Sequence, residues 1–183
     1  MTQLTHRALA EIGAVLDAIP QTQMDDMVQI IRSAHRIALH GVGREGLMMK
    51  SLAMRLYHVG LDAHVVGDMT TPPLTTDDLL LVSAGPGQFR TVGALVEVAK
   101  TAGAMTLCVT AEPSGLVPIS CDHVVHLPAQ TMASDQNDGA SVLPMGSLFE
   151  ATQFLFFELV VLRLRDALGL SPEDMRANHT NLE

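Results

Sequence analysis

The stretch RIALHGVGREG, residues 36–46, decides the fold class of this chain. Its first half is a short apolar run, which is typical of a buried strand, and its second half has the glycines of a tight turn. A helical pattern follows from about Arg44 to His58. A strand, a glycine turn and a helix in this order predict one unit of an α/β fold built on a parallel sheet.

The same alternation continues along the chain. Two helices are expected over residues 5–34, separated by Pro20. Later segments predict strands at 63–66, 79–83, 105–110 and 123–127, and a helix that ends near Ala102. A long polar loop at 128–144 is followed by a helix at 147–168 and by a short last helix that starts at Ser171 and Pro172. We therefore predict a single domain over residues 1–183. Its N-terminal helices span 5–34, and its C-terminal helix plus tail spans 147–183.

The composition limits the possible partners. The chain has 183 residues, 48% of them hydrophobic, which suffices for one sizeable core. A formal net charge of −9 with only 11 Lys and Arg argues against binding to nucleic acid, which requires a basic face. An anionic ligand would have to be held by backbone donors and a few placed cations.

Several features predict a cytoplasmic protein without a membrane partner. The N-terminal stretch MTQLTHRALAEIG lacks the continuous apolar core of a signal peptide, and no other segment has the length of a transmembrane span without charges. Cys108 and Cys121 lie in apolar runs and show neither metal-ligand spacing nor a disulfide framework. This pattern fits a reducing compartment and gives no sign of a metal.

Residues 41–46 form a G-x-G-x-x-G pattern between a strand and a helix, with Asp68 beyond the second strand. Such a pattern can bind a dinucleotide, but the two preceding helices and the short chain argue against that interpretation. A tight turn without any ligand is the other alternative. In general, glycines at a helix N-terminus let the backbone approach an anion.

A second glycine turn follows the strand at 79–83, over Ser83 to Thr91. Turns after parallel strands meet at the carboxyl edge of the sheet, where open α/β sheets bind ligands. The residues predicted to bind substrate come from the two turns: Gly41, Gly43, Arg44, Glu45, Ser83, Gly85, Gly87, Gln88, Arg90 and Thr91.

Two residues outside these turns are candidates for catalysis. Glu150 follows the long loop, but Ser147-x-x-Glu150 also has the spacing of a helix capping box, in which the glutamate needs no catalytic role. His179 lies in the last residues of the chain and by position alone would be a solvated tail residue. Spacing therefore favours structural roles for both.

A resemblance changes this expectation. Seven motifs carry it: Gly41-x-Gly43-Arg44, Ala53-Met54-Arg55-Leu56, His58-x-Gly60, Val65-Val66-Gly67-Asp68, Thr70-Thr71-Pro72, Pro144-x-Gly146-x-Leu148-Phe149-Glu150 and the tail from Met175 through His179 to Glu183. Through these motifs the chain resembles the 6-phospho-3-hexuloisomerase family, a branch of the sugar isomerase (SIS) domain class. These motifs cover nearly the whole chain in order.

The resemblance implies a three-layer α/β/α fold with a five-stranded parallel sheet of the flavodoxin-like type, and a homotetramer. It also implies the interconversion of two ketose phosphates through an enediol(ate), which needs a base next to a carbonyl and neither a metal nor an organic cofactor. Glu150 matches the family's base. His179 matches its C-terminal histidine, which would move protons among oxygens and could enter a neighbouring subunit's site.

The anion-binding turn departs from the family pattern S-G-S-G-E-T. Ala84, Pro86 and Phe89 replace hydroxyl residues and Gln88 replaces Glu, so that three hydroxyl donors are lost, and Pro86 also lacks an N–H. Glu45 stands where a small hydroxyl residue is usual.

The third departure lies in the tail, where Asn178 replaces a basic residue. Three hypotheses remain: an isomerase for a sugar with a different phosphate, sulfonate or carboxylate group, a true 6-phospho-3-hexuloisomerase, and a non-catalytic sugar-phosphate-binding regulatory module.

Overall fold

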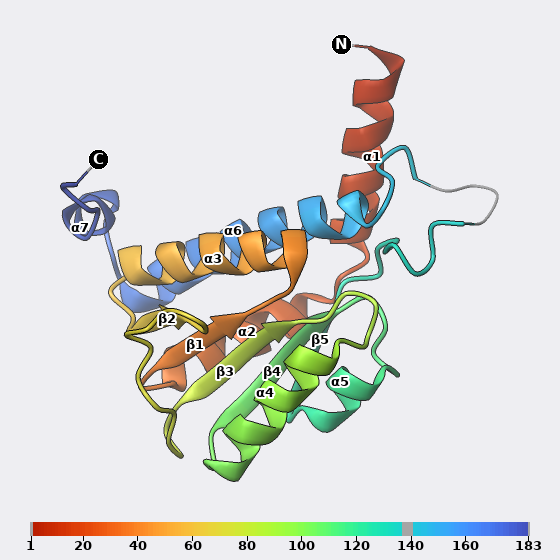
Figure 1. Ribbon diagram of the computed structural model, residues 1–183. Helices are drawn as coiled ribbons and strands as arrows, with labels where there is room; N and C mark the ends of the chain where they lie inside the picture. The colour runs from red at the N-terminus through yellow and green to blue at the C-terminus, as the bar shows by residue number, and fades with distance from the viewer. Residues whose placement is uncertain (1, 137–140, 183) are drawn as a thin grey trace.

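The computed structural model describes residues 2–136 and 141–182. Its sheet has five strands, all parallel to their neighbours, in the order β2-β1-β3-β4-β5. Helices cover both faces of the sheet, so the chain forms three layers (Figure 1). The predicted three-layer α/β fold is therefore confirmed, and the strand order is the flavodoxin-like one.

The strands are shorter than most of the helices that cover them. The strands are β1 (Ile37–His40), β2 (Ala63–Val65), β3 (Leu79–Ser83), β4 (Met105–Thr110) and β5 (His123–His126). The helices are α1 (Gln3–Asp17), α2 (Gln21–Ser33), α3 (Gly43–His58), α4 (Arg90–Thr101), α5 (Leu116–Ser120), α6 (Ser147–Leu168) and α7 (Pro172–Ala177).

Two apolar cores lie on opposite faces of the sheet. The first packs α2, α3 and α6 against the strands and contains Ile31, Leu56 and Phe156; the second packs α4 and α5 and contains Val92 and Val117. The central strand β3 is buried at all five positions. A strand that is covered on both faces has apolar residues at consecutive positions, and this pattern is why the sequence predicted β3 correctly.

Most elements agree with the sequence prediction. The boundaries of β3, β4 and α6 coincide with the predicted 79–83, 105–110 and 147–168. The last helix begins with the predicted cap, because the Ser171 hydroxyl accepts from the Asp174 N–H and the Asp174 carboxylate accepts in return. The short helix α5 was not predicted, since five residues are too few to show a helical period.

In the described part of the chain, no helix combines the length and the apolar character needed to cross a membrane.

Candidate active site

The two glycine turns meet where the strand order reverses. β1 and β3 are neighbours, but the chain leaves β1 toward β2 on one side and leaves β3 toward β4 on the other. Open α/β sheets bind ligands at this switch point, beyond the carboxyl ends of the strands. The turns 41–46 and 83–89 therefore lie where the sequence predicted a site.

Close packing and backbone conformation explain why glycines occupy the first turn. A Cβ at Gly46 would lie 2.5 Å from the carbonyl oxygen of Gly41, so strand and helix could not approach as they do. Gly43 has a φ of 60°, which is unfavourable for other residues. This geometry accounts for the G-x-G-x-x-G pattern as a close strand-to-helix turn.

A cavity of about 460 Å³ opens beside these turns. It is lined by Val42, Gly43, Arg44, Glu45, Pro86, Phe89, Thr131, Met132, Ala133, Met145, Gly146, Phe149 and Glu150. Most of these residues are apolar. The charged groups among them are those of Arg44, Glu45 and Glu150.

Three helices begin at this cavity. Their N-cap residues, Val42 of α3, Phe89 of α4 and Gly146 of α6, all line it, and none of them caps its helix with a side chain. The first N–H groups of a helix have no intrahelical partner, and the helix dipole adds partial positive charge there. The cavity is therefore suited to an anionic ligand.

Glu150 lies at the cavity in an ion pair with Arg44, whose Nε is 3.0 Å from the carboxylate Oε2. The same guanidinium donates to the Ser147 hydroxyl and to the carbonyl oxygen of Met145. The capping box that the spacing favoured is not formed, because α6 starts one residue earlier than that motif requires, with Gly146 at the N-cap. Glu150 thus makes no capping hydrogen bond and faces the cavity.

Two effects act on the Glu150 carboxyl. Partial burial raises its pKa, and the nearby Arg44 charge opposes that shift by favouring the ionised form. A carboxylate with a raised pKa is a stronger base than a solvated one. The arrangement can therefore accept a proton from a ligand in the cavity.

Glu45 is buried, with only 7% of its surface exposed. Its Oε2 accepts hydrogen bonds from the Ser83 hydroxyl at 2.5 Å and from the Gly85 N–H at 2.9 Å. The Ser83 hydroxyl in turn accepts from Nε2 of Gln153 at 2.8 Å. Burial raises the pKa of Glu45, the two donors oppose the shift, and the Glu150 charge adds to it.

The other predicted binding residues lie around the cavity without lining it. Gln88, Arg90 and Thr91 are exposed in the turn and at the start of α4. A Cβ on Gly87 would lie 3.0 Å from Glu112, so this glycine serves the packing of the following loop. Ala84 is fully buried in the second core, so that a hydroxyl at this position would not reach the cavity.

His179 lies at the other end of the α3–α6 layer. Its ring stacks on His58, with 5.2 Å between ring centroids, and Asn178 donates to the His58 carbonyl oxygen. His58 ends α3, whereas Glu45 lies in its first turn. Since a helix rises about 1.5 Å per residue, the two ends are roughly 20 Å apart. Within one chain, His179, which follows α7, is therefore far from Glu150 in the first turn of α6; Figure 1 shows α7 at the opposite end of α6 from its start.

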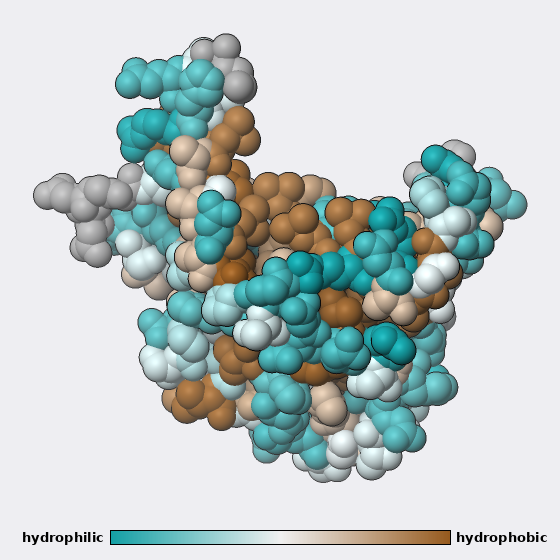
Figure 2. All heavy atoms as spheres, turned by 180° about the vertical axis from the view of Figure 1, so that it is seen from behind, coloured by the Kyte–Doolittle hydropathy of each residue, from teal (hydrophilic) through white to brown (hydrophobic). Residues whose placement is uncertain are grey.

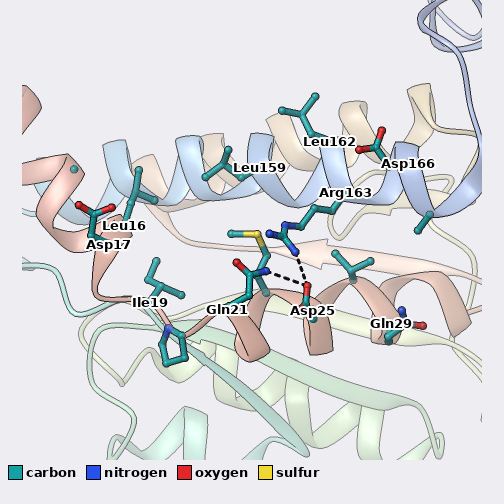
Figure 3. A pocket seen from close by; sticks show the side chains of 15 residues that line it. Leu16, Asp17, Ile19, Gln21, Asp25, Gln29, Leu159, Leu162, Arg163 and Asp166 are labelled. Atoms are coloured by element: carbon teal, nitrogen blue, oxygen red, sulfur yellow. Dashed lines mark hydrogen bonds and ion pairs between the residues drawn. The ribbon is translucent and has the colours of Figure 1, made fainter.

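A wider groove of about 900 Å³ lies between α1, α2 and α6. Figure 3 shows its apolar side chains, including Leu16 and Leu159, and the ion pair between Arg163 and Asp25. Its lining comes from these three helices and from Ile19 and Pro20 in the connection between α1 and α2. It has the character of a packing surface rather than of a site for chemistry.

Gln153 was not predicted as a site residue. Its spacing of three residues from Glu150 places both on one side of α6, and this spacing was the feature of the sequence that could have indicated it. Its Oε1 and the Thr152 hydroxyl are buried without a hydrogen-bond partner in the described structure.

No group of three or more His, Cys, Asp or Glu side chains within residues 2–136 and 141–182 is arranged to hold a metal ion.

Comparison with known proteins places this geometry in context. A family model described as the SIS domain matches residues 30–154. The chain is 35% identical over its whole length to the 3-hexulose-6-phosphate isomerase of Bacillus subtilis (strain 168), of which it covers 98%. It is also 35% identical to the 3-hexulose-6-phosphate isomerase of Mycobacterium gastri, over 94% of this chain and 86% of that protein.

The fold is also similar to a crystal structure of a Methanococcus jannaschii protein, with a TM-score of 0.86 and 27% sequence identity over the whole of both chains. That structure is described as inferring a molecular function of 3-hexulose-6-phosphate isomerase. The similarity thus extends from one end of the chain to the other.

Proposed function

The chain belongs to the SIS domain family, and from that premise we propose that it is an isomerase of phosphorylated ketoses, with Glu150 as the base. The observation that carries the proposal is the meeting of Glu150 with the N-termini of α3, α4 and α6 in one cavity. A base and an anion-binding surface are what the reaction of a sugar phosphate needs.

The reaction moves a carbonyl group to the neighbouring carbon. The Glu150 carboxylate removes a proton from the carbon next to the carbonyl, giving an enediol(ate), and returns a proton to the former carbonyl carbon. Protons also move between the two oxygens, and no net oxidation occurs. Arg44 stands beside the base, and its charge opposes the rise that burial causes in the pKa of Glu150, which favours the ionised form that the first step needs.

We propose the relatives' reaction, between 3-hexulose 6-phosphate and fructose 6-phosphate, as the first to assay. The turn over residues 84–89 lacks the family's hydroxyls, and among the residues replacing them Pro86 and Phe89 present apolar surface to the cavity. A sugar with another phosphate, a sulfonate or a carboxylate is therefore the alternative substrate. Thermal-shift measurements with such sugars rank them, because a ligand of the folded state raises its melting temperature.

The enzyme is further proposed to be a homo-oligomer, with a tetramer as the family resemblance implies. Figure 2 shows hydrophobic atoms gathered between the projecting helix α1 and the C-terminal α7. Phe154, Leu155, Leu159 and Leu162 of α6 are each about two-fifths exposed. An exposed apolar surface of this kind is typical of a subunit contact. Such a contact could bring His179 of one subunit to the cavity of another.

The decisive experiment on the base compares Glu150→Gln with Glu158→Gln. Both glutamates lie on α6 and pair with an arginine of α3 at 3.0 Å, but only Glu150 lines the cavity. Loss of a general base lowers turnover by roughly 10²- to 10⁴-fold. We expect this loss for Glu150→Gln at unchanged folding, and near-normal turnover for Glu158→Gln.

Two other results would count against the proposal. Near-normal turnover by Glu150→Gln would remove the assignment of the base. Tight binding of sugar phosphates by the unmodified protein without any turnover would instead indicate the non-catalytic binding module.

A further inference from the structure

Glu45 places a carboxylate in the part of the cavity where an anionic ligand is expected. It lies in the first turn of α3 and lines the cavity together with Glu150. A dianionic phosphate group next to an ionised, buried carboxylate would be repelled, because the surrounding dielectric is low. The position therefore conflicts with the binding of sugar phosphates unless the charge of Glu45 is removed.

The hydrogen bonds of Glu45 show how the carboxyl group is oriented. Oε2 accepts from both Ser83 and Gly85, so that this oxygen has two donors. No described residue donates to Oε1. Oε1 is thus the oxygen without a hydrogen bond from a described residue, and it lies beside Gly85, where a Cβ would come within 2.8 Å of it. A protonated carboxyl group has one O–H donor, and Oε2 needs no proton to keep its two partners.

We propose that Glu45 takes up a proton from solvent when a sugar phosphate binds and donates this proton, through Oε1, in a hydrogen bond to the phosphate. The inference rests on the proposed function, since it concerns the same cavity. Protonated Glu45 then supplies a hydroxyl donor at the position where the resembling family has a small hydroxyl residue. Ionised Glu45 excludes the same ligand, so this residue sets both specificity and the pH range of binding.

Burial and the neighbouring negative charge favour the protonated form of Glu45 and outweigh the two hydrogen bonds from Ser83 and Gly85, which favour the ionised form. Burial is the main cause of the raised pKa of Glu45, and the charge of Glu150 on α6 raises it further. The Glu45 charge contributes to the raised pKa of the Cys108 thiol of β4, so this thiol stays neutral and adds no charge beside Glu45. The nearest cation on its own helix, Arg44, pairs with Glu150 instead. An incoming phosphate adds negative charge and raises the pKa again.

Calorimetry can count the protons taken up. Binding of fructose 6-phosphate is measured between pH 6.5 and 8.5 in buffers with different ionisation heats, for the unmodified protein, Glu45→Gln, Glu45→Ser and Glu97→Gln, an exposed control on α4. In the unmodified protein we expect uptake approaching one proton at the alkaline end. Its affinity should fall by up to about tenfold per pH unit there.

The variants distinguish Glu45 from other titrating groups. The Glu45→Gln amide donates without needing a proton, and the Glu45→Ser hydroxyl does the same. Both variants should bind the phosphate sugar with little proton uptake and more tightly at pH 8.5. Glu97→Gln should behave like the unmodified protein. Glu150→Gln should keep most of the uptake, because its carboxyl group is not the one that is protonated.

Proton uptake of equal size in Glu45→Gln and in the unmodified protein would overturn the inference and leave the proposed function standing. Binding by the unmodified protein with a pH dependence no larger than that of Glu45→Gln would overturn it in the same way. If none of the proteins binds fructose 6-phosphate or 3-hexulose 6-phosphate at any pH, both the substrate class and the inference are wrong.

Discussion

At the scale of single residues, two ion pairs join α3 to α6 at the same nitrogen–oxygen distance. Arg44 pairs with Glu150 at the cavity, and Arg55 pairs with Glu158 three turns further along α3, each at 3.0 Å. The pairs differ in what surrounds them, because only the first lines the cavity. This makes the second pair an internal control for the first.

We predict that Arg44→Met shifts the acid limb of the pH–rate profile to higher pH. Burial raises the pKa of Glu150 and Arg44 lowers it, so that removal of the cation leaves the raising effect unopposed. The base must be ionised to act, and therefore activity is lost at a higher pH as the solution is made more acidic. The measurement is kcat/KM against pH, which reports the free enzyme.

Arg55→Met should leave the acid limb in place. An equal displacement in both variants would show that the limb reports the overall charge or stability of the protein rather than the ionisation of Glu150.

Residue roles were only partly predictable from the sequence. Glu150 was predicted to be a base only through the resemblance. Its spacing from Ser147 favoured a capping box, because spacing does not reveal which residue occupies the N-cap. The hydrogen bonds from Ser83 and Gly85 to Glu45 join segments nearly 40 residues apart. Only the packing of α3 against β3 brings them together. Gln153 was missed for the same reason.

At the scale of elements, the fourth residues of α3 and α4 are both glycines, Gly46 and Gly93. A Cβ at Gly46 would meet the Gly41 carbonyl at 2.5 Å, whereas at Gly93 it would meet only Val117 at 3.9 Å. The two helices that follow neighbouring strands therefore tolerate a side chain at this position very differently.

We predict that Gly46→Ala lowers the free energy of unfolding by about 1–3 kcal/mol, because backbone must move to admit the methyl group. Gly93→Ala should raise it by about 0.5–1 kcal/mol, since alanine is favoured inside helices. Denaturant unfolding of both variants at one protein concentration measures the difference. A neutral Gly46→Ala would contradict the close contact of strand and helix.

Elements with many buried apolar residues were predicted well. β3 is an apolar run that ends at Ser83, and β4 is buried at all positions but its first; both were placed to the residue. The sequence order of strands and helices led to the parallel sheet. α5 has five residues, of which Val117 and Pro118 are buried, and the sequence shows too little of it to establish a period. Short elements depend on the packing around them rather than on their own pattern.

At the scale of the whole molecule, the two predicted catalytic residues lie at opposite ends of the α3–α6 layer. We predict that Glu150→Gln and His179→Ala, each nearly inactive alone, regain activity when their subunits are mixed and allowed to exchange. In a random mixture, about a quarter of sites would combine an intact Glu150 with an intact His179 from another subunit. Turnover before and after exchange is the measurement.

Light scattering should show that the oligomers keep the same size before and after mixing, and mass spectrometry of isotopically labelled subunits should show that they have exchanged. A monomer at micromolar concentration would contradict the shared site. So would exchange without any regained turnover. In either case His179 would act only where it lies in its own chain, against His58.

The groups around the cavity come from separate parts of the chain. Glu150 stands on α6, whereas Glu45, Ser83 and Gly85 belong to the turns after β1 and β3. Substitutions in these turns exchange the groups that meet a ligand's charge while the sheet and α6 keep their positions. A scaffold divided in this way allows ligand preference to evolve through a few turn residues, while the proposed base stays on a separate helix.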